Sequence, residues 1–503
     1  MPPSSYNLAW DCLGRWAIER PEKTALIICD GSRSRRHYIY REIDSMARRL
    51  ASGFLASGLM KGDRIMIRAA NSVDFVLAFF AATMIGCVAQ PASKRLTSEE
   101  TRKFAADSGA RAIVADDISA GEQVAPADLI LFDHRKIERF LVEAAPAEYA
   151  ATAADDPAYL VFTSGSTAHP KGVLHAHRVV IGRRPMAPDW LGLTDEDIVL
   201  HAGDINWTYA LGVGVLDPFA AGATGVLYAG PRDPAIWPRL VNAVGATIFA
   251  AVPGVYRQIL KYAEARSLSM PTLRHCVTAG EAMTPDLLAH WRDATGTWAY
   301  EALGMSEIST YVSCRPGDPI RPGSAGRPQR GRRVAILPVE GGEEPLAPGE
   351  TGLIAVHRSD PGLMLGYWNR PEEESAVFRG EWFVGGDLAE FDADGFLWFR
   401  GRNDDIMNAL GYRVSPLEVE KVLGADPTVA DVAVAERQVA EGVSIIVGFV
   451  VPKGESQAVE ADLLANCARH LASYKCPRKI VFISEIPRTP NGKLNRSALP
   501  QVL

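Results

Sequence analysis

Ten residues in the first half of the chain have the composition of a phosphate-binding loop. Residues 163–172 read Thr-Ser-Gly-Ser-Thr-Ala-His-Pro-Lys-Gly and follow the apolar run Tyr159-Leu160-Val161-Phe162. Hydroxyl groups, glycine backbone and one ammonium group supply many hydrogen-bond donors and no carboxylate. Such a loop can wrap the phosphates of a nucleotide triphosphate, although a plain solvent-exposed turn has the same composition.

The lysine of this loop does not stand where a P-loop ATPase would have it. The Walker A pattern places Ser or Thr directly after Gly-Lys, whereas Lys171 follows Pro170 and precedes Gly172. The sequence therefore disfavours a P-loop ATPase and leaves other nucleotide-binding enzymes open.

Residues that suit the same nucleotide recur further along the chain. Glu307 offers an anionic oxygen of the kind that Mg²⁺ takes when it bridges phosphates, and the hydroxyl of Ser306 can bind the α-phosphate. Asp387 follows two glycines and can accept both ribose hydroxyls. Each pattern also has an ordinary structural use, because Ser-Glu often begins a helix and Gly-Gly-Asp often forms a turn. Lys493, in a Pro- and Gly-rich loop, would by itself be a solvated surface lysine.

Seven segments in order resemble the adenylate-forming superfamily of acyl-CoA synthetases, adenylation domains and luciferases. The resemblance extends over nearly the whole chain. One such motif is weakly specific, but seven in order at plausible separations are not expected by chance. They are residues 163–172, Thr278-Ala279-Gly280-Glu281, Leu303-Gly304-Met305-Ser306-Glu307, Trp382-Phe383-Val384-Gly385-Gly386-Asp387, Gly401-Arg402-Asn403-Asp404-Asp405, Gly411-Tyr412-Arg413 and Pro487-Arg488-Thr489-Pro490-Asn491-Gly492-Lys493.

The resemblance implies a role for each matching residue. Lys493, Glu307 and Ser306 are the implied catalytic residues, and Glu307 is the implied Mg²⁺ ligand. Asp404 is implied as the hinge of a rotating small domain, and Gly411 and Tyr412 as part of the CoA tunnel. The implied ATP- and AMP-binding residues are Thr163, Ser164, Gly165, Ser166, Thr167, Lys171, Gly280, Glu281, Asp387, Arg402 and Arg413.

The chemistry implied for Lys493 needs no general acid or base. A carboxylate is already a nucleophile at neutral pH, so its attack on the α-phosphorus of ATP requires positioning and neutralisation of charge. The resemblance also implies that acetylation of Lys493 would switch the enzyme off, which would make a lysine acetyltransferase and a deacetylase its partners.

The acid is expected to bind among aromatic and small residues. The aromatic side chains and the small residues leave a flat apolar slot for an aryl or alicyclic ring, although ordinary core packing explains part of the set equally well. In segments such as Gly366-Tyr367-Trp368-Asn369, the chain is most similar to benzoate-CoA ligases and then to medium-chain acyl-CoA synthetases. Thr310, however, stands where benzoate-CoA ligases often have a histidine. The pocket residues expected are Trp207, Tyr209, Ala210, Ala279, Gly304, Met305 and Ile308.

These residues predict an ATP-dependent carboxylic acid:CoA ligase. It would form AMP through an acyl-adenylate, with ATP, Mg²⁺ and CoA, and would act on an aryl, alicyclic or medium-chain carboxylate. The alternative is a stand-alone adenylation enzyme that loads a carrier protein. An amino-acid substrate would want a carboxylate for its ammonium group, and Asp204 is the only candidate near the expected pocket.

The net charge, the cysteines and the apolar stretches of the sequence fit a cytoplasmic enzyme with small-molecule substrates. A net charge of -7 argues against nucleic acid as a partner, and seven scattered cysteines suggest reduced thiols. The most apolar stretch, Phe75 to Ala89, is short for a membrane span, so no stable membrane insertion is expected. A homodimer is one oligomeric state that the sequence leaves open.

The elements that must position these residues follow an alternating α/β pattern. Strands are expected at 24–29 and 64–69, a helix at 40–55, and a helix after Thr97, which forms a capping box with Glu100. Residues 116–156 are weakly patterned. With 503 residues, we expect an α/β protein with a large multi-layer N-terminal domain, residues 1–402, and a small mobile α+β domain, residues 403–503.

Overall fold

The computed structural model describes residues 3–31, 35–116, 129–163, 171–231, 233–403, 407–409, 412–440, 443–454, 459–471, 473, 475–489 and 494–501. The chain divides into two compact units. The large unit comprises Met1–Arg333 and His357–Ala376, and the small unit comprises Val334–Val356 and Val377–Leu503. The boundary expected after residue 402 falls within the small unit and remains a prediction about domain movement.

The main sheet of the large unit is mostly parallel. In the described residues it has nine strands in the order β15-β14-β13-β12-β11-β9-β10-β1-β2. The strands β13, β12, β11, β9, β10 and β1 pair in parallel, and antiparallel strands flank them. The bounds are β1 Thr24–Cys29, β2 Arg35–Ile39, β9 Ile198–His201, β10 Thr224–Tyr228, β11 Ile248–Ala251, β12 His275–Ala279, β13 Ala299–Met305, β14 Ser309–Ser313 and β15 Arg327–Pro328.

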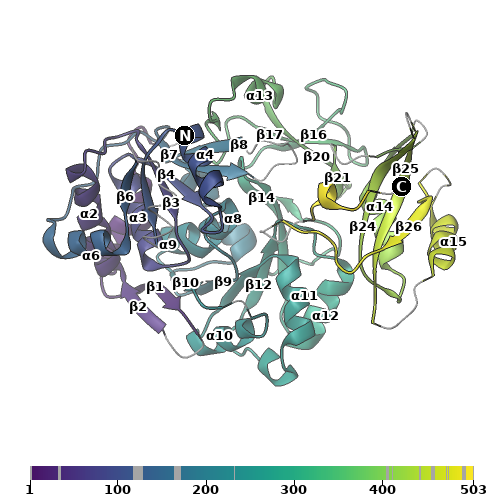
Figure 1. Ribbon diagram of the computed structural model, residues 1–503, viewed down its shortest axis with the longest axis horizontal. Helices are drawn as coiled ribbons and strands as arrows, with labels where there is room; N and C mark the ends of the chain where they lie inside the picture. The colour runs from purple at the N-terminus through teal and green to yellow at the C-terminus, as the bar shows by residue number, and fades with distance from the viewer. Residues whose placement is uncertain are drawn as a thin grey trace. The chain divides into compact units, whose positions relative to one another are not determined.

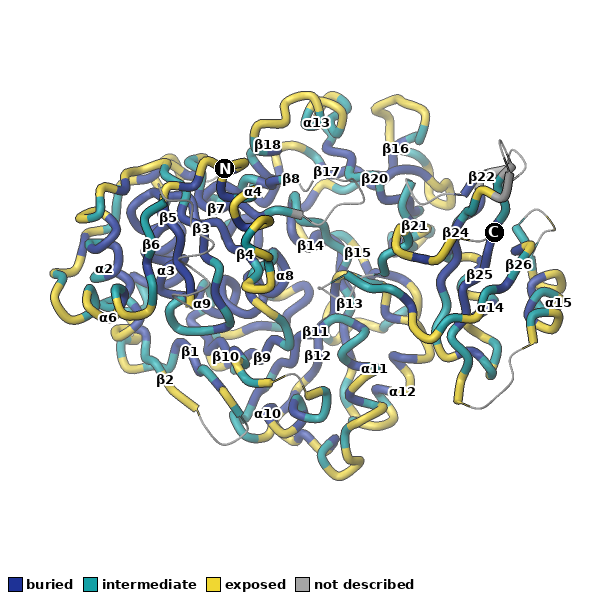
Figure 2. Tube along the Cα trace, in the orientation of Figure 1, coloured by how far each residue is buried: buried dark blue, intermediate teal, exposed yellow. Residues whose placement is uncertain are grey.

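Helices and a short helical segment cover the two faces of the main sheet. On one face, β9, β11 and β12 pack against α10 (Ile236–Val244), α11 (Pro253–Tyr262) and α12 (Pro285–Thr295), as Figure 1 shows. On the other face, Tyr209 and the segment Ala187–Leu191 pack against alternate residues of the same strands. Because both faces are covered, the central strands are buried along their length (Figure 2).

The second sheet of the large unit has seven strands among the described residues, in the order β18-β8-β7-β4-β3-β5-β6. One face packs against α2, α3 and α6, and the other against α4. The bounds are β3 Arg64–Arg68, β4 Val88–Ala92, β5 Ala110–Ala115, β6 Ile130–Phe132, β7 Pro157–Thr163, β8 Lys171–Ala176, β18 Gly366–Tyr367, α2 Tyr40–Ala56, α3 Val73–Met84, α4 Ser98–Ser108 and α6 His134–Glu143. Shorter helices of this unit are α1 Arg15–Glu19, α7 Val179–Arg183, α8 Thr208–Leu211, α9 Asp217–Ala221 and α13 Pro371–Ala376.

The small unit holds three sheets within the part of the chain that is described. The first runs β16-β17-β20-β19 with β21 on β20, the second pairs β22 with β23, and the third is β24-β25-β26, against which α14 and α15 pack. The bounds are β16 Val334–Leu337, β17 Gly352–His357, β19 Phe378–Arg379, β20 Trp382–Phe391, β21 Leu397–Arg402, β22 Met407–Ala409, β23 Tyr412–Val414, β24 Val429–Ala440, β25 Val443–Pro452, β26 Lys479–Phe482, α14 Pro416–Gly424 and α15 Glu460–His470.

Most of the elements expected from hydrophobic periodicity are confirmed. The α/β class holds, β1 has the expected bounds, and the Thr97–Glu100 capping box begins α4. The weakly patterned residues 116–156 contain α6, whose first turn is capped by the Asp133 carboxylate accepting from the backbone N of Lys136 at 2.7 Å. A search of the described helices finds none with the length and apolarity that a bilayer crossing requires.

One buried ion pair fastens α7 to α9 in the large unit. The Arg183 guanidinium donates from Nε and Nη2 to the two Asp217 carboxylate oxygens, each at 2.7 Å, and the side chains are 3% and 7% exposed. A third nitrogen, Nη1, donates to the Ser309 hydroxyl. Gly212 makes room for the guanidinium, since a Cβ there would overlap Arg183. The pair therefore fixes the start of β14 as well as the two helices.

We expect Asp217→Asn to lower the free energy of unfolding by about 3–5 kcal/mol, because it leaves the buried guanidinium without a counter-charge. The matched control is Glu264→Gln, which removes the carboxylate of the exposed Arg266–Glu264 pair and should change stability by less than about 0.5 kcal/mol. Urea unfolding followed by tryptophan fluorescence measures both. Similar small changes in the two variants would contradict the structural importance assigned to the buried pair.

Candidate functional site

Strand pairing holds both ends of the expected phosphate loop. Thr163 is the last residue of β7, Lys171 is the first residue of β8, and the two are paired across the antiparallel ladder. Ser164, Gly165, Ser166 and Thr167 lie outside the described residues. The strand β7 therefore ends, and β8 begins, at the same end of this antiparallel pair in the second sheet.

The lysine of this loop and the expected metal ligand meet through a tyrosine. Lys171 Nζ lies 2.7 Å from Glu373 Oε2 and 5.2 Å from the centre of the Tyr367 ring. The Tyr367 hydroxyl donates to Glu307 Oε1 at 2.7 Å. Tyr367 is positioned by β18, which pairs with β8. The structure therefore brings Lys171 to the ring, and Glu307 to the hydroxyl, of one aromatic side chain.

Sequence patterns did not single out Tyr367 or Glu373 as site residues. Tyr367 belongs to the segment Gly366-Tyr367-Trp368-Asn369, whose similarity to benzoate-CoA ligases was a signal that could have found it. Glu373 lies on α13 among three consecutive glutamates, and nothing in that run distinguishes it from a solvated helix face.

Backbone contacts hold the turn that carries Ser306 and Glu307. The Ser306 carbonyl accepts from His175 Nε2 at 2.8 Å, and the Glu307 carbonyl accepts from the backbone N of Met364 at 2.7 Å. Burial lowers the pKa of His175 to about 4, so its ring is neutral and donates from Nε2 to the carbonyl. The turn is thus fastened to β8 and to the segment before β18.

The same turn requires a glycine in β13. A Cβ on Gly304 would lie 2.5 Å from the Ser309 carbonyl oxygen and 2.7 Å from the Thr310 Cα, which is closer than real Cβ contacts allow. Ser309 itself has φ 74°, an uncommon value for a residue with a side chain, and its hydroxyl is held by Arg183.

Glu307 provides one carboxylate, which is the share that proteins commonly supply to Mg²⁺ when phosphate oxygens and waters complete the shell. The residues present therefore fit that ion.

The expected pocket residues gather near the carboxyl ends of the central strands of the main sheet. Ala279 ends β12, Gly304 and Met305 end β13, and Ile308 lies in the turn that follows. Trp207, Tyr209 and Ala210 come from the start of α8. The Trp207 and Tyr209 rings meet edge to face, with centroids 5.4 Å apart. Tyr209, Ala210, Ala279 and Ile308 are buried, while Trp207 and Met305 are half-buried.

Gly280 and Glu281 form the turn directly after β12. Gly280 has φ 96°, a conformation that favours glycine, and Glu281 is half-buried. Two residues later the backbone N of Met283 donates to Glu301 Oε2 at 3.2 Å, which ties this turn to β13.

The small unit brings two further expected residues together. Asp387 on β20 is paired in register with Arg402 on β21, and Arg402 Nη1 lies 3.3 Å from Asp387 Oδ1. Tyr412 and Arg413 belong to β23. Asp404, Gly411 and Lys493 lie outside the described residues.

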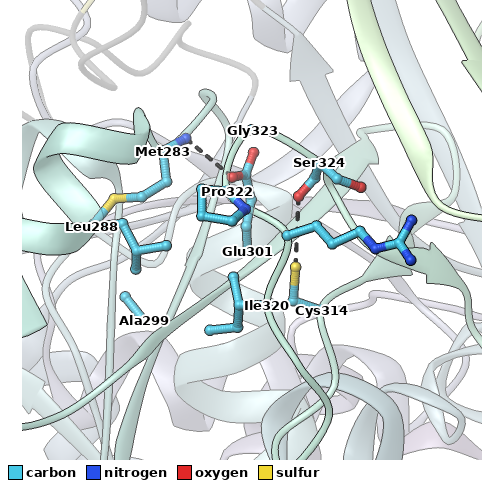
Figure 3. Close-up of a pocket in the computed structure, with 10 residues that line it drawn as sticks. Met283, Leu288, Ala299, Glu301, Cys314, Ile320, Pro322, Gly323 and Ser324 are labelled. Atoms are coloured by element: carbon cyan, nitrogen blue, oxygen red, sulfur yellow. Dashed lines mark hydrogen bonds between the residues drawn. The ribbon is translucent and has the colours of Figure 1, made fainter.

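Glu301, a half-buried residue of β13, lines a small pocket. Figure 3 shows Glu301 between Met283 on one side and Ser324 on the other, with the Cys314 thiol donating to the Ser324 carbonyl at 3.6 Å. Burial raises the pKa of Glu301 to about 8. The side chain is therefore mostly protonated at neutral pH.

The raised pKa of Glu301 predicts a pH-dependent stability. Between about pH 4.5, where a carboxyl titrates in the unfolded chain, and about pH 8, only the folded state keeps the proton. The stabilisation is complete below the unfolded pKa and falls by about 1.4 kcal/mol per pH unit until the folded pKa is passed. Glu301→Gln has no such proton, so its free energy of unfolding should rise relative to that of the unmodified protein from pH 5 to 8.

Urea unfolding at pH 5, 6, 7, 8 and 9 measures this difference. Glu99→Gln, at an exposed position in the first turn of α4, should show no such trend. A difference for Glu301→Gln that stays constant across this range would show that Glu301 is already ionised in the folded protein.

Comparisons with known proteins identify the family of the chain. Residues 13–368 match the family model described as AMP-binding enzyme, and residues 418–493 match the AMP-binding enzyme C-terminal domain. A 3-hydroxybenzoate-CoA/4-hydroxybenzoate-CoA ligase of Thauera aromatica is 31% identical over 532 residues, which cover 100% of this chain and 98% of that protein.

Two further comparisons concern benzoate-CoA ligases. The enzyme of Thauera aromatica is 31% identical over 526 residues, covering 99% of this chain and 96% of that protein. The crystal structure of a benzoate-CoA ligase from Burkholderia xenovorans LB400 superposes with a TM-score of 0.88 at 29% identity, covering 98% of this chain and 99% of that one.

Proposed function

The chain belongs to the AMP-binding enzyme family and is an AMP-forming acyl-CoA synthetase. We propose that its substrate is an aromatic carboxylic acid. The acid carboxylate attacks the α-phosphorus of ATP and releases pyrophosphate, which leaves an acyl-adenylate. The thiol of CoA then attacks the acyl carbonyl, loses its proton and displaces AMP. The products are an aryl-CoA thioester, AMP and pyrophosphate.

The cluster of Lys171, Tyr367 and Glu307 supports the adenylation step of the proposal. Lys171 lies over the Tyr367 ring, and the hydroxyl of that ring donates to the Glu307 carboxylate. Lys171 would hold the β- and γ-phosphates, and Glu307 would hold Mg²⁺, which when bound neutralises phosphate charge. One cationic and one anionic group held at fixed separation suit a metal-bound polyphosphate.

The aromatic substrate is supported by the residues at the strand ends and by the relatives. The edge-to-face pair of Trp207 and Tyr209 lies with Ala210 at the start of α8, Ala279 ends β12, and Gly304 precedes the last residue of β13. Flat aromatic walls beside small residues leave a slot that suits a planar ring better than a bulky one. Two relatives are named for benzoate and hydroxybenzoates.

Asp387 would bind the ribose, and Lys493 would be the catalytic lysine. The Asp387 carboxylate, beside Arg402, can accept from both ribose hydroxyls. Lys493, for which only the sequence argues, would neutralise charge on the α-phosphate during adenylation. Asp204 does not support the alternative of an adenylation enzyme that loads a carrier protein. Its carboxylate, the candidate partner for the ammonium group of an amino acid, pairs with Arg95 at 3.3 Å.

A panel of acids tests the proposed substrate class. We expect purified enzyme with ATP, Mg²⁺ and CoA to release AMP with benzoate or a substituted benzoate at a kcat/KM at least about tenfold above that for cyclohexane carboxylate or C4 to C10 fatty acids. Each reaction is repeated without CoA, where AMP formation should nearly cease and pyrophosphate release should fall to a single turnover. The best rate with a fatty acid would contradict the aromatic assignment, and AMP with no acid at all would contradict the ligase function.

The two half-reactions test the proposed function of Lys493. Lys493→Ala should slow acyl-adenylate formation by about 100-fold or more, because the transition state loses a positive charge, while thioester formation from supplied acyl-adenylate stays nearly unchanged. Lys453→Ala, an exposed lysine in the same unit, is the control and should leave both steps intact. Equal losses in both half-reactions would contradict a function limited to adenylation.

A further inference from the structure

His201 ends β9, in the middle of the main sheet and on the face that carries the expected pocket. It is paired with Ala250 of β11, and Ala250 is paired in turn with Val277 of β12. Paired residues of neighbouring strands point to the same side of a sheet, and so do residues two apart on one strand. His201 therefore shares its face with Ala279, two residues beyond Val277. Both lie at the carboxyl ends of parallel strands, where α/β proteins bind ligands.

The His201 ring lies against an expected pocket residue. Its centroid is 4.7 Å from that of Tyr209, and the two rings meet edge to face at 77°. A Cβ on Gly203 would lie 2.9 Å from His201 Cε1, and one on Gly214 would lie 3.3 Å from His201 Cβ. The glycines therefore give the imidazole the space that it occupies beside Tyr209.

His201 differs from the other buried histidines in the described part of the chain. His175, His177 and His275 each bond one ring nitrogen to a backbone group at 2.8–3.0 Å. His201 is 1% exposed, and neither of its ring nitrogens has a hydrogen-bond partner among the described residues. Buried polar atoms in folded proteins are nearly always bonded, since an unmet bond costs free energy. An imidazole without any partner at a strand end therefore points to a bond made with something else.

The chemistry of the missing partner follows from the state of the ring. Burial lowers the pKa of His201 to about 3, so the imidazole is neutral and presents one donor and one acceptor. A hydroxyl can bond to either nitrogen, and an amino group can donate to the unprotonated one. A charged substituent would be unfavourable in this buried surrounding, because the neutral ring brings no counter-charge.

We propose that His201 is a specificity-determining residue that hydrogen-bonds a hydroxyl or amino substituent on the ring of the aromatic acid. The proposal rests on the aryl-CoA ligase function above and deepens it, because it selects hydroxy- and aminobenzoates over unsubstituted benzoate. Tyr209 would contact the ring of the acid, and His201, beside Tyr209 on the same sheet face, would contact the substituent.

Substrate selectivity of the full-length enzyme tests the proposal. The kcat/KM for CoA-dependent AMP formation is measured with benzoate and with the ortho, meta and para isomers of hydroxy-, amino- and fluorobenzoate. We expect at least one hydroxy or amino isomer to exceed both benzoate and the fluoro isomer of the same position. His201→Leu should lower kcat/KM for that isomer by about 10- to 100-fold and change the value for benzoate less than about threefold. His201→Gln, which keeps a donor and an acceptor, should recover part of the preference.

His177→Leu is the matched control, because it removes a buried imidazole elsewhere in the large unit. It should alter kcat/KM for all acids by the same factor. The same uniform factor in His201→Leu would overturn the proposal and make His201 a structural residue. The unmodified enzyme provides a test that does not depend on folding of a variant, since equal kcat/KM for hydroxy, amino and fluoro isomers would also overturn it. If the unmodified enzyme forms no AMP with any aromatic acid, the proposed function itself fails, which is a distinct outcome.

Discussion

The close contact between Gly304 and the first residues of β14 is the constraint on which the candidate site depends. β13 and β14 approach so closely there that a single added methyl group would meet the Ser309 carbonyl at 2.5 Å. The register of the pair shifts at this point, between Leu303 and Gly304. The chain can therefore reverse within the residues that carry Ser306 and Glu307. A larger residue at 304 would push the strands apart and move the carboxylate that faces Tyr367.

This turn also joins the two sheets of the large unit. Glu307 follows a strand of the main sheet, whereas its partner Tyr367 belongs to β18 of the second sheet. His175, on β8 of the second sheet, donates a hydrogen bond to the Ser306 carbonyl of the same turn. The contacts are hydrogen bonds of defined direction, so they fix orientation as well as distance. Lys171 begins β8, which pairs with β18, so the lysine that we propose binds phosphate and the glutamate that we propose binds Mg²⁺ both contact Tyr367.

Local patterns predicted the elements well and the contacts between distant residues poorly. β1 and the capping box of α4 follow from alternation and from cap chemistry within a few residues, which is information that a sequence carries directly. α6 was hidden because its helical pattern is short and lies in an Ala- and Asp-rich region. The partners Tyr367 and Glu307 are 60 residues apart, and only the pairing of β18 with β8 brings them together. The sequence did not indicate His201 either, because only the packing of distant segments around it shows that its ring nitrogens have no partner among the described residues.

The ion pair with Glu373 would hold Lys171, the lysine that we propose binds phosphate, in place before the ligand arrives. Both side chains are about one-third exposed, at 29% and 37%, so water screens the pair and its net stabilisation is modest. The Tyr367 ring adds an attraction that does not depend on Glu373, because its π-face favours a cation. A polyphosphate carries more negative charge than one carboxylate and offers several acceptor oxygens to the same ammonium. In the proposed function, exchange of Glu373 for phosphate would therefore be favourable, and the Tyr367 ring would hold the Lys171 ammonium while the exchange occurs.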